Sequence, residues 1–222
     1  ILFTSDKDNL QLGFPISAIE IYVINADGSD ETRLTFDSNN DQQPSWSPDG
    51  DKIVYETYEE VAGEWRFALY TINSDGSGQT RLTPLEDPYQ NSFGTSSLPY
   101  YEGPIWSPSG TKIIFSRFEK KWELYSINAD GSGFTELASA RASGISYYSW
   151  SSDGSKIVYT SDHADPGEND LWIINPDGSN KTRLTFYGTP GQYPSQASFS
   201  TDGTKIAFVL ANNNVSNSPS QI

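Results

Sequence analysis

The sequence contains no cysteine and only one histidine, and both shortages remove classes of chemistry. Without cysteine the chain can form no disulfide, no thiolate metal site and no cysteine nucleophile. A catalytic serine would have only His163 as its base, and no Gly-x-Ser-x-Gly string accompanies that histidine. The sequence therefore offers little support for catalysis.

Basic residues are also scarce. The 14 lysines and arginines stand against 29 acidic residues, which gives a net charge of −15. Nucleic acids and anionic membranes bind clustered basic residues, so both are disfavoured as partners. A cationic, metal-bearing or neutral partner fits this charge better.

Long apolar stretches are missing as well. No run approaches the roughly 18 consecutive apolar residues of a membrane span, and no signal segment opens the chain. The chain starts without methionine, which predicts processing or a missing upstream segment. Its 14% aromatic content, with abundant asparagine, serine, threonine, glycine and aspartate, indicates an all-β exported protein, periplasmic or extracellular.

What the sequence does contain is a repeat made of two alternating strings. Asn-x-Asp-Gly-Ser occurs after an apolar run at 25–29, 73–77, 128–132 and 175–179. The second string is Trp46-Ser-Pro-Asp-Gly50, with counterparts at 106–110, 150–154 and, with Phe199 in place of tryptophan, 199–203. Two hairpin signatures that alternate at a period of roughly 50 residues indicate one supersecondary unit copied along the chain. Function must then be sought in what differs between the copies.

Each unit is expected to hold four strands, because its short runs of β-branched and aromatic residues are bounded by turn residues. In the first copies these strands are predicted at 21–24, 32–36, 45–47 and 52–57. The runs are nearly continuously apolar, which suits sheets covered on both faces. The Asp-Gly turns predict tight hairpins that share one face of the molecule. The longer, variable connections should emerge on the opposite face.

The string Ser47-Pro-Asp-Gly50 with Lys52-Ile-Val-Tyr55, joined to Asn-x-Asp-Gly-Ser and Thr-Arg-Leu-Thr, resembles the TolB-type β-propeller repeat. That repeat is also found in propeller domains of prolyl-oligopeptidase-like and tricorn-like proteases. The resemblance implies a periplasmic adaptor that receives peptides and lipoprotein partners near the propeller axis. TolB-type propellers usually have six blades, so the copy number departs from the family.

The predicted fold class is therefore all-β, a β-propeller of four-stranded antiparallel blades, with four complete units and a partial one. The propeller would cover 1–210, in units of about 1–49, 50–109, 110–153, 154–202 and a partial 203–210, followed by a polar tail or linker at 211–222. The first unit begins at its second strand, and 197–210 supplies two strands without outer partners.

Residues that recur in every unit are expected to be structural. The tryptophans Trp46, Trp106 and Trp150 are predicted to pack blade against blade, although a ligand platform is the alternative. Arg33, Arg81 and Arg183 are expected to be solvated or paired on outer strands, and Glu136 replaces them in the third copy.

Aromatic residues that depart from the repeat are the ligand-binding candidates. They suit sugar stacking or a protein hot spot, because they combine contact area with hydrogen-bonding neighbours. The alternative is that the long loops bury their own aromatics. The candidates are Tyr58, Trp65, Tyr89, Phe93, Tyr100, Tyr101, Phe118, Tyr147, Tyr148, Tyr187 and Tyr193, with Trp122 placed to join them.

A calcium site is the other candidate, because hard cations favour clustered oxygen ligands. The loop 162–170 carries four carboxylates within nine residues. They belong to Asp162, Asp165, Glu168 and Asp170. The alternative is a merely solvated acidic loop.

The function that these observations favour is a non-catalytic binding or adaptor module that engages a protein or polysaccharide through its loop-rich face. One alternative is a self-assembling subunit, a homo-oligomer joined through its terminal strands. Others are a glycan-processing enzyme that uses acids such as Glu59, Glu60, Glu86 and Asp87, and the propeller of a larger peptidase.

Overall fold

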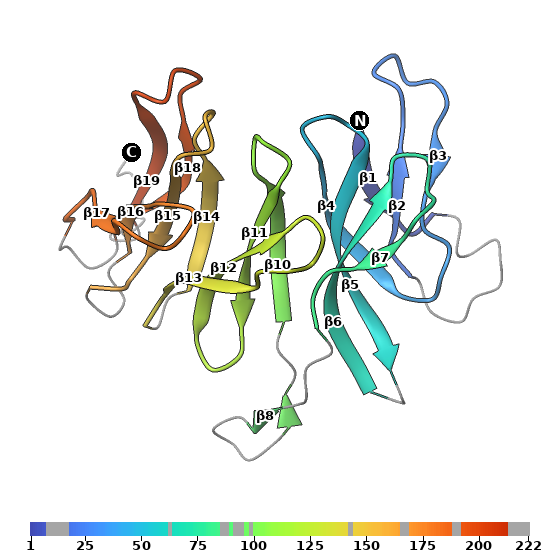
Figure 1. Ribbon diagram of the computed structural model, residues 1–222, viewed down its shortest axis with the longest axis horizontal. Helices are drawn as coiled ribbons and strands as arrows, with labels where there is room; N and C mark the ends of the chain where they lie inside the picture. The colour runs from blue at the N-terminus through green and yellow to red at the C-terminus, as the bar shows by residue number, and fades with distance from the viewer. Residues whose placement is uncertain are drawn as a thin grey trace, which may run out of the picture. The chain divides into compact units, whose positions relative to one another are not determined.

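The computed structural model describes residues 1–7, 18–61, 64–84, 89–90, 96–97, 100–141, 144–164, 169–187 and 192–212. Every regular element in these ranges is a β-strand (Figure 1). A search of the same ranges for a helix long and apolar enough to cross a membrane finds none.

The strands form a series of sheets in chain order, which we call blades 1 to 5. Blades 2, 3 and 4 have four strands each, whereas blade 1 has three and blade 5 has two. Blade 1 consists of β1 (Leu2–Ser5), β2 (Glu20–Val23) and β3 (Thr32–Arg33), and blade 5 consists of β18 (Gln192–Phe199) and β19 (Ile206–Asn212).

The four-stranded blades keep the predicted order of first, second, third and outer strand. A short pair, β8 (Tyr89–Gln90) and β9 (Ser96–Ser97), precedes blade 3. Blade 2 is β4 (Asn40–Trp46), β5 (Lys52–Val61), β6 (Glu64–Asn73) and β7 (Thr80–Arg81); blade 3 is β10 (Tyr100–Trp106), β11 (Lys112–Phe118), β12 (Trp122–Asn128) and β13 (Thr135–Ser139); blade 4 is β14 (Ile145–Trp150), β15 (Ile157–Ser161), β16 (Asp170–Ile174) and β17 (Thr182–Arg183).

The chain divides into two compact units. The first comprises Ile1–Lys120 with Tyr125–Thr135, and the second comprises Lys121–Leu124 with Glu136–Ile222. Blades 1 and 2 lie in the first unit, and blades 4 and 5 lie in the second.

The core of the first unit lies between consecutive sheets. On β5, Ile53 and Tyr55 pack with residues of blade 1, while the residue between them, Val54, packs with Phe115 and other residues of blade 3. Successive side chains of a strand point to opposite faces, so blade 2 is buried on both. This explains why the apolar runs are nearly continuous.

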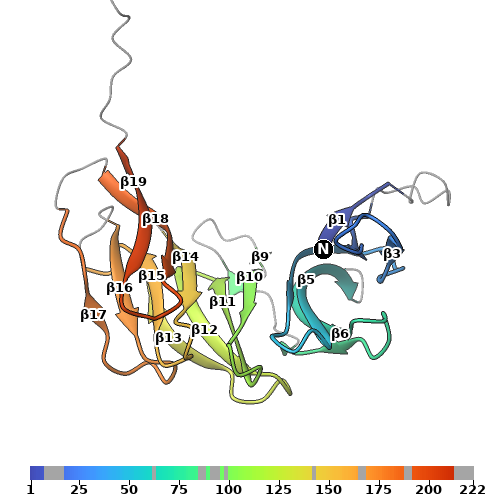
Figure 2. The same cartoon turned by 90° about the horizontal axis from the view of Figure 1, so that it is seen from above.

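The second unit follows the same rule. Val158 and Leu171 of blade 4 cluster with Ala197 of blade 5. Strand β18 contacts β14, and the blade 5 hairpin lies beside blade 4 in both views (Figures 1 and 2).

The tryptophans that recur in the repeat differ in burial. Trp106 belongs to the core cluster of the first unit, and Trp150 is also buried. Trp46 is 36% exposed, so the predicted packing role does not hold equally for all three residues.

The two tight hairpins of each four-stranded blade lie at the same end, as predicted. In blade 2 the Lys52 ammonium donates a hydrogen bond to the Asn73 side-chain oxygen at 3.4 Å. Equivalent bonds join Lys112 to Asn128 at 3.0 Å and Lys156 to Asn175 at 2.5 Å. The lysine after the first hairpin therefore bonds the asparagine that opens the second.

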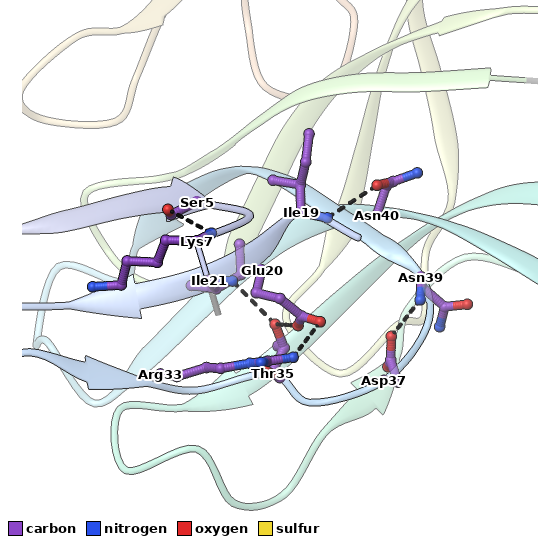
Figure 3. A network of polar contacts seen from close by, with 10 residues as sticks. All are labelled: Ser5, Lys7, Ile19, Glu20, Ile21, Arg33, Thr35, Asp37, Asn39 and Asn40. Atoms are coloured by element: carbon purple, nitrogen blue, oxygen red, sulfur yellow. Dashed lines mark hydrogen bonds and ion pairs between the residues drawn. The ribbon is translucent and has the colours of Figure 1, made fainter. Parts of the chain in front are cut away.

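The Thr-Arg-Leu-Thr string fastens the outer strand of blade 1 to its neighbour (Figure 3). Arg33 donates to Glu20 at 2.5 Å, and the Thr35 hydroxyl donates to the same carboxylate at 2.6 Å. The Ile21 backbone N–H donates to the Thr35 hydroxyl at 3.0 Å. Because a side chain takes this bond, the ladder ends at Arg33, and the predicted strand 32–36 is shorter than expected.

Blades 2 and 4 form a similar ion pair with different residues, whereas blade 3 has Glu136 at the arginine position. Arg183 pairs with Asp170, whereas Arg81 pairs with Glu59. Blade 2 has Ala68 at the position of Glu20, which explains the change of partner. The arginines are thus paired rather than solvated.

A glycine of the second hairpin packs against the outer strand of the preceding blade. A Cβ on Gly76 would lie 3.3 Å from the Leu34 carbonyl oxygen, and one on Gly131 would lie 3.3 Å from the Leu82 carbonyl oxygen. Gly28 has the same positive φ as Gly76 but nothing within 4 Å of its Cβ position. The two glycines therefore separate the effect of backbone conformation from that of packing.

We expect Gly76→Ala to destabilise the protein more than Gly28→Ala. Both substitutions add the left-handed penalty of about 1 kcal/mol, but only alanine at position 76 meets the backbone of a neighbouring blade. Urea unfolding of the two variants measures the difference. Equal losses of stability would contradict this account of how the blades meet.

Candidate functional site

A β-bulge interrupts the first strand of blades 2 to 5. The bulges lie between Gln42 and Ser45, Glu102 and Ile105, Ser146 and Ser149, and Ser195 and Ser198. One residue in each has a positive φ, namely Gln43 (49°), Gly103 (62°), Tyr147 (53°) and Gln196 (53°). We call these four positions the first-strand bulges.

Three of these residues adopt a conformation that their side chains disfavour. Glycine enters the left-handed region freely, whereas other residues lose roughly 1 to 2 kcal/mol there. The Gln43, Tyr147 and Gln196 side chains are all exposed, and Tyr147 is 51% exposed. Bulges redirect side chains and are frequent beside functional sites.

Blades 2 and 3 differ from the others just before the bulge. In that register Gln42 faces Glu56, Glu102 faces Ser116 and Ser195 faces Val209. The pair of facing residues just before the bulge therefore contains one acid in each of these two blades. The acid is Glu56 on β5 in blade 2 and Glu102 on β10 in blade 3. Serine, threonine, glutamine or valine occupies these positions otherwise.

The Glu102 carboxylate affects the protonation of the buried Glu56. Glu56 is 7% exposed and accepts a hydrogen bond from the Gln43 side-chain amide at 3.3 Å. Its other oxygen, Oε2, has no hydrogen-bond partner among the described residues. Burial, and then the nearby Glu102 carboxylate, raise the pKa of Glu56 to about 8. At neutral pH this carboxyl is therefore mostly protonated.

Aromatic rings adjoin the acids. The Tyr58 and Phe67 rings lie 4.6 Å apart between centroids, and the Phe67 and Tyr100 rings lie 5.1 Å apart. Burial, and then Glu102, raise the pKa of the Tyr100 hydroxyl, so Tyr100 connects the rings to the acids. We call this set the acidic-aromatic cluster: Gln43, Glu56, Tyr58, Phe67, Tyr100 and Glu102.

Two of the predicted ligand-binding aromatics, Tyr58 and Tyr100, are brought together in this cluster. Tyr101 lies in the core instead, because it is 1% exposed and its ring meets that of Phe115 at 5.7 Å. It follows Tyr100 on the strand and points to the opposite face. Tyr148 is also buried, at 9% exposure.

The remaining candidates lie elsewhere. Tyr147 is exposed at a first-strand bulge, and Phe118 faces Tyr100 across the blade 3 ladder. Tyr187 and Tyr193 are half-buried in the second unit. The side chains of Trp65 and Tyr89, and the whole of Phe93, fall outside the described residues.

Asp170, one of the predicted calcium ligands, has protein partners instead. Its carboxylate accepts hydrogen bonds from Arg183 Nε at 2.9 Å and from the Thr185 hydroxyl at 2.8 Å. It is 1% exposed and forms the blade 4 counterpart of the Glu20 contact. Asp170 therefore holds the outer strand.

Asp162 is likewise engaged, because it accepts the Arg141 backbone N–H at 2.7 Å. Asp165 and Glu168 fall outside the described residues. Within the ranges that the structure describes, no three histidine or acidic side chains gather as a metal site would require. Calcium binding by this loop stays a prediction.

Sequence reasoning missed Gln43, Glu56 and Glu102. A signal for Glu56 was present, because aligned copies have Ser116 and Thr160 at its position. The relation between Glu56 and Glu102 required the strand register of two blades, which one sequence does not supply.

A β-propeller is built from consecutive four-stranded antiparallel sheets that pack face to face. The sheets of this chain have that architecture, and their first strands carry the bulges. A family profile described as the TolB beta propeller domain matches residues 95–221, more than half of the chain. The chain therefore belongs to the TolB β-propeller domain family.

Solved structures share this fold at low sequence identity. TolB from Acinetobacter baumannii is 20% identical, with a TM-score of 0.64, and the match covers 88% of this chain and 44% of TolB. An oligogalacturonate lyase in complex with manganese is 16% identical, with a TM-score of 0.60, over 87% of this chain and 54% of the lyase. A puromycin hydrolase is 17% identical, with a TM-score of 0.61, and the match covers 88% of this chain and 30% of the hydrolase. The chain thus spans about half or less of these proteins.

We expect Glu56→Gln to change how stability depends on pH. The unfolded state releases the Glu56 proton near the ordinary value of 4.5, whereas the folded state retains it to about 8. The folded protein therefore loses stability as pH rises between these values, and glutamine removes that loss.

Denaturant unfolding from about pH 5 to pH 8 checks this expectation, with an advantage for the glutamine variant that grows to a few kcal/mol. Asp51→Asn removes the same charge at an exposed hairpin position and is the matched control. Parallel curves for Glu56→Gln and the original protein would show that burial does not perturb this carboxyl.

Proposed function

We propose that this chain is a non-catalytic, exported propeller module, periplasmic or extracellular, that binds a protein partner through side chains exposed at individual first-strand bulges, such as Tyr147 and Gln196 of the second unit. The observation that carries the proposal is the strain at Gln43, Tyr147 and Gln196. Gly103 adopts the same conformation without cost, so packing alone does not call for a larger residue there. Exposed side chains kept at a strained position suit recognition.

The resemblance to TolB supports a protein partner, because TolB-type propellers are adaptors that receive peptides and lipoprotein partners. Net charge also supports a basic or neutral partner over nucleic acid. The proposed surface differs from the loop-rich face expected from the sequence, because the distinctive residues of the described chain lie on first strands.

Two residues that catalysis could use, His163 and Glu59, have structural partners, which supports a binding role. His163 Nδ1 lies 3.0 Å from the Ser139 carbonyl oxygen, and its ring meets Trp172 edge to face. Glu59, a candidate acid for glycan processing, bonds both Arg81 and the Tyr70 hydroxyl. Glu86 and Asp87 fall outside the described residues.

Site-specific cross-linking tests the binding proposal. A photoreactive phenylalanine analogue at Tyr147 should give a discrete adduct with a protein of the source cell envelope or medium. The same analogue at Thr201, which is exposed on the tight β18–β19 hairpin, should give none. Adducts at both positions, or at neither, would contradict binding through the bulges.

Assembly is a second candidate function, and exposed apolar residues on blade 5 favour it. Phe208, Val209 and Leu210 of β19 are 38%, 50% and 43% exposed. Leu184 is 40% exposed, although its counterpart Leu82 is buried at 5%. Exposed apolar strand edges are templates for pairing with another copy.

If this surface joins copies of the chain, light scattering should show oligomers that grow with concentration. Val209→Lys places a charge on the exposed strand and should return the protein to a monomer, as should deletion of residues 196–222. A full-length chain that is monomeric at every concentration would rule out assembly.

A further inference from the structure

The acidic-aromatic cluster of the first unit has the chemistry of a site for an organic cation. We propose that it binds the ammonium group of lysine or the guanidinium group of arginine. The inference deepens the proposed function, because a protein partner would supply such a side chain. It assigns a ligand group to residues of blades 2 and 3 that lie within one compact unit.

Glu56 has a buried carboxylate oxygen that accepts no hydrogen bond from the described residues. Glu56 is 7% exposed, and its Oε2 lacks a hydrogen-bond donor among the described residues. A buried polar atom without a partner destabilises the folded state, so a hydrogen-bond donor from a ligand would offset that loss. Gln43, whose amide bonds the other oxygen, is exposed and lies at the surface end of this pair.

Two acids from different blades, Glu56 and Glu102, lie near each other. Glu102 is half-buried and destabilises the charged form of Glu56. A cation beside both carboxyls would replace repulsion by attraction. No other copy of the repeat among the described blades combines two acids in this way.

Three aromatic rings pack together beside the acids. Tyr58, Phe67 and Tyr100 are half-buried, so part of each remains exposed beside the acids. Aromatic rings attract ammonium and guanidinium groups through cation–π interactions. They offer nothing to a hard metal ion, which prefers several oxygen ligands. An organic cation therefore fits this cluster better than calcium does.

Binding should be coupled to pH. The groups that face Glu56 are Gln43 from β4 and Glu102 with Tyr100 from β10, while Leu69 faces it across β6. Below about 8 Glu56 is mostly protonated, so a cation must displace the proton before it gains the full attraction. Affinity should rise with pH up to about 8 and then level off.

A titration of the full chain with Nα-acetyl-lysine methylamide, whose side-chain ammonium is free, tests the site. The Nα-acetyl-norleucine methylamide analogue is the neutral control. Tyrosine ring resonances in nuclear magnetic resonance spectra report binding. We expect shifts for Tyr58 and Tyr100 with the lysine compound alone, and an affinity about tenfold higher at about pH 9 than at about pH 7.

Glu56→Gln should weaken binding at the higher pH about tenfold or more and abolish its pH dependence. Asp51→Asn, with the same change of charge, should bind as the original protein does. Any of three results would overturn the proposal. The norleucine analogue could bind equally well, Glu56→Gln could have no effect, or calcium could displace the lysine compound.

The test is independent of the proposed function. Binding of the lysine compound with no cross-linked partner would leave the cation site standing and remove the partner. A cross-linked partner with no response to the lysine compound would leave the binding module and overturn the cation site.

Discussion

The structure depends on sheets that bury their faces against neighbouring sheets, as blade 2 does against blades 1 and 3. Ile53 and Tyr55 serve one neighbour and Val54 serves the other, so no blade completes its core alone. Burial of such side chains contributes roughly 1.5 to 3 kcal/mol each, and it constrains both sets of alternating positions. Variation is left to strand ends, bulges and loops, which is where the distinctive residues lie.

Polar contacts fix the arrangement that apolar burial stabilises. The arginine of the outer strand keeps an acidic partner although the partner's strand changes, from Glu20 on the neighbouring strand of blade 1 to Glu59 on the second strand of blade 2. A buried ion pair contributes little net stability, because desolvation offsets its attraction. Its value here is in register, since a shift of one residue would leave both charges buried without a partner.

Much of the fold could be predicted from the sequence, because its determinants are local. The Asp-Gly turns fix the hairpins, and the continuous apolar runs indicate sheets covered on both faces. Strand ends were predicted less well, since a side-chain hydroxyl on Thr35 takes over a ladder bond. Tyr101 shows the same limit, because which face a residue occupies depends on register.

The candidate site was only partly predictable, for a related reason. Tyr58 and Tyr100 stood out as departures from the repeat, but Glu56 and Glu102 acquire their meaning from each other. That relation crosses from one blade to the next and depends on a bulge that no turn residue announces. Interactions within a repeat can be predicted from its copies, whereas interactions between unlike copies require the structure.

The ion pairs and lysine–asparagine contacts are each internal to one blade, which bears on how such a chain can evolve. A tandem duplication of a single blade would carry these polar contacts into the new position. The paired acids would not survive the same event intact, because Glu56 and Glu102 belong to adjacent blades, and an inserted copy would separate them. Blade number can thus change by gene duplication, whereas a contact between unlike blades, such as that of Glu56 with Glu102, must be built again.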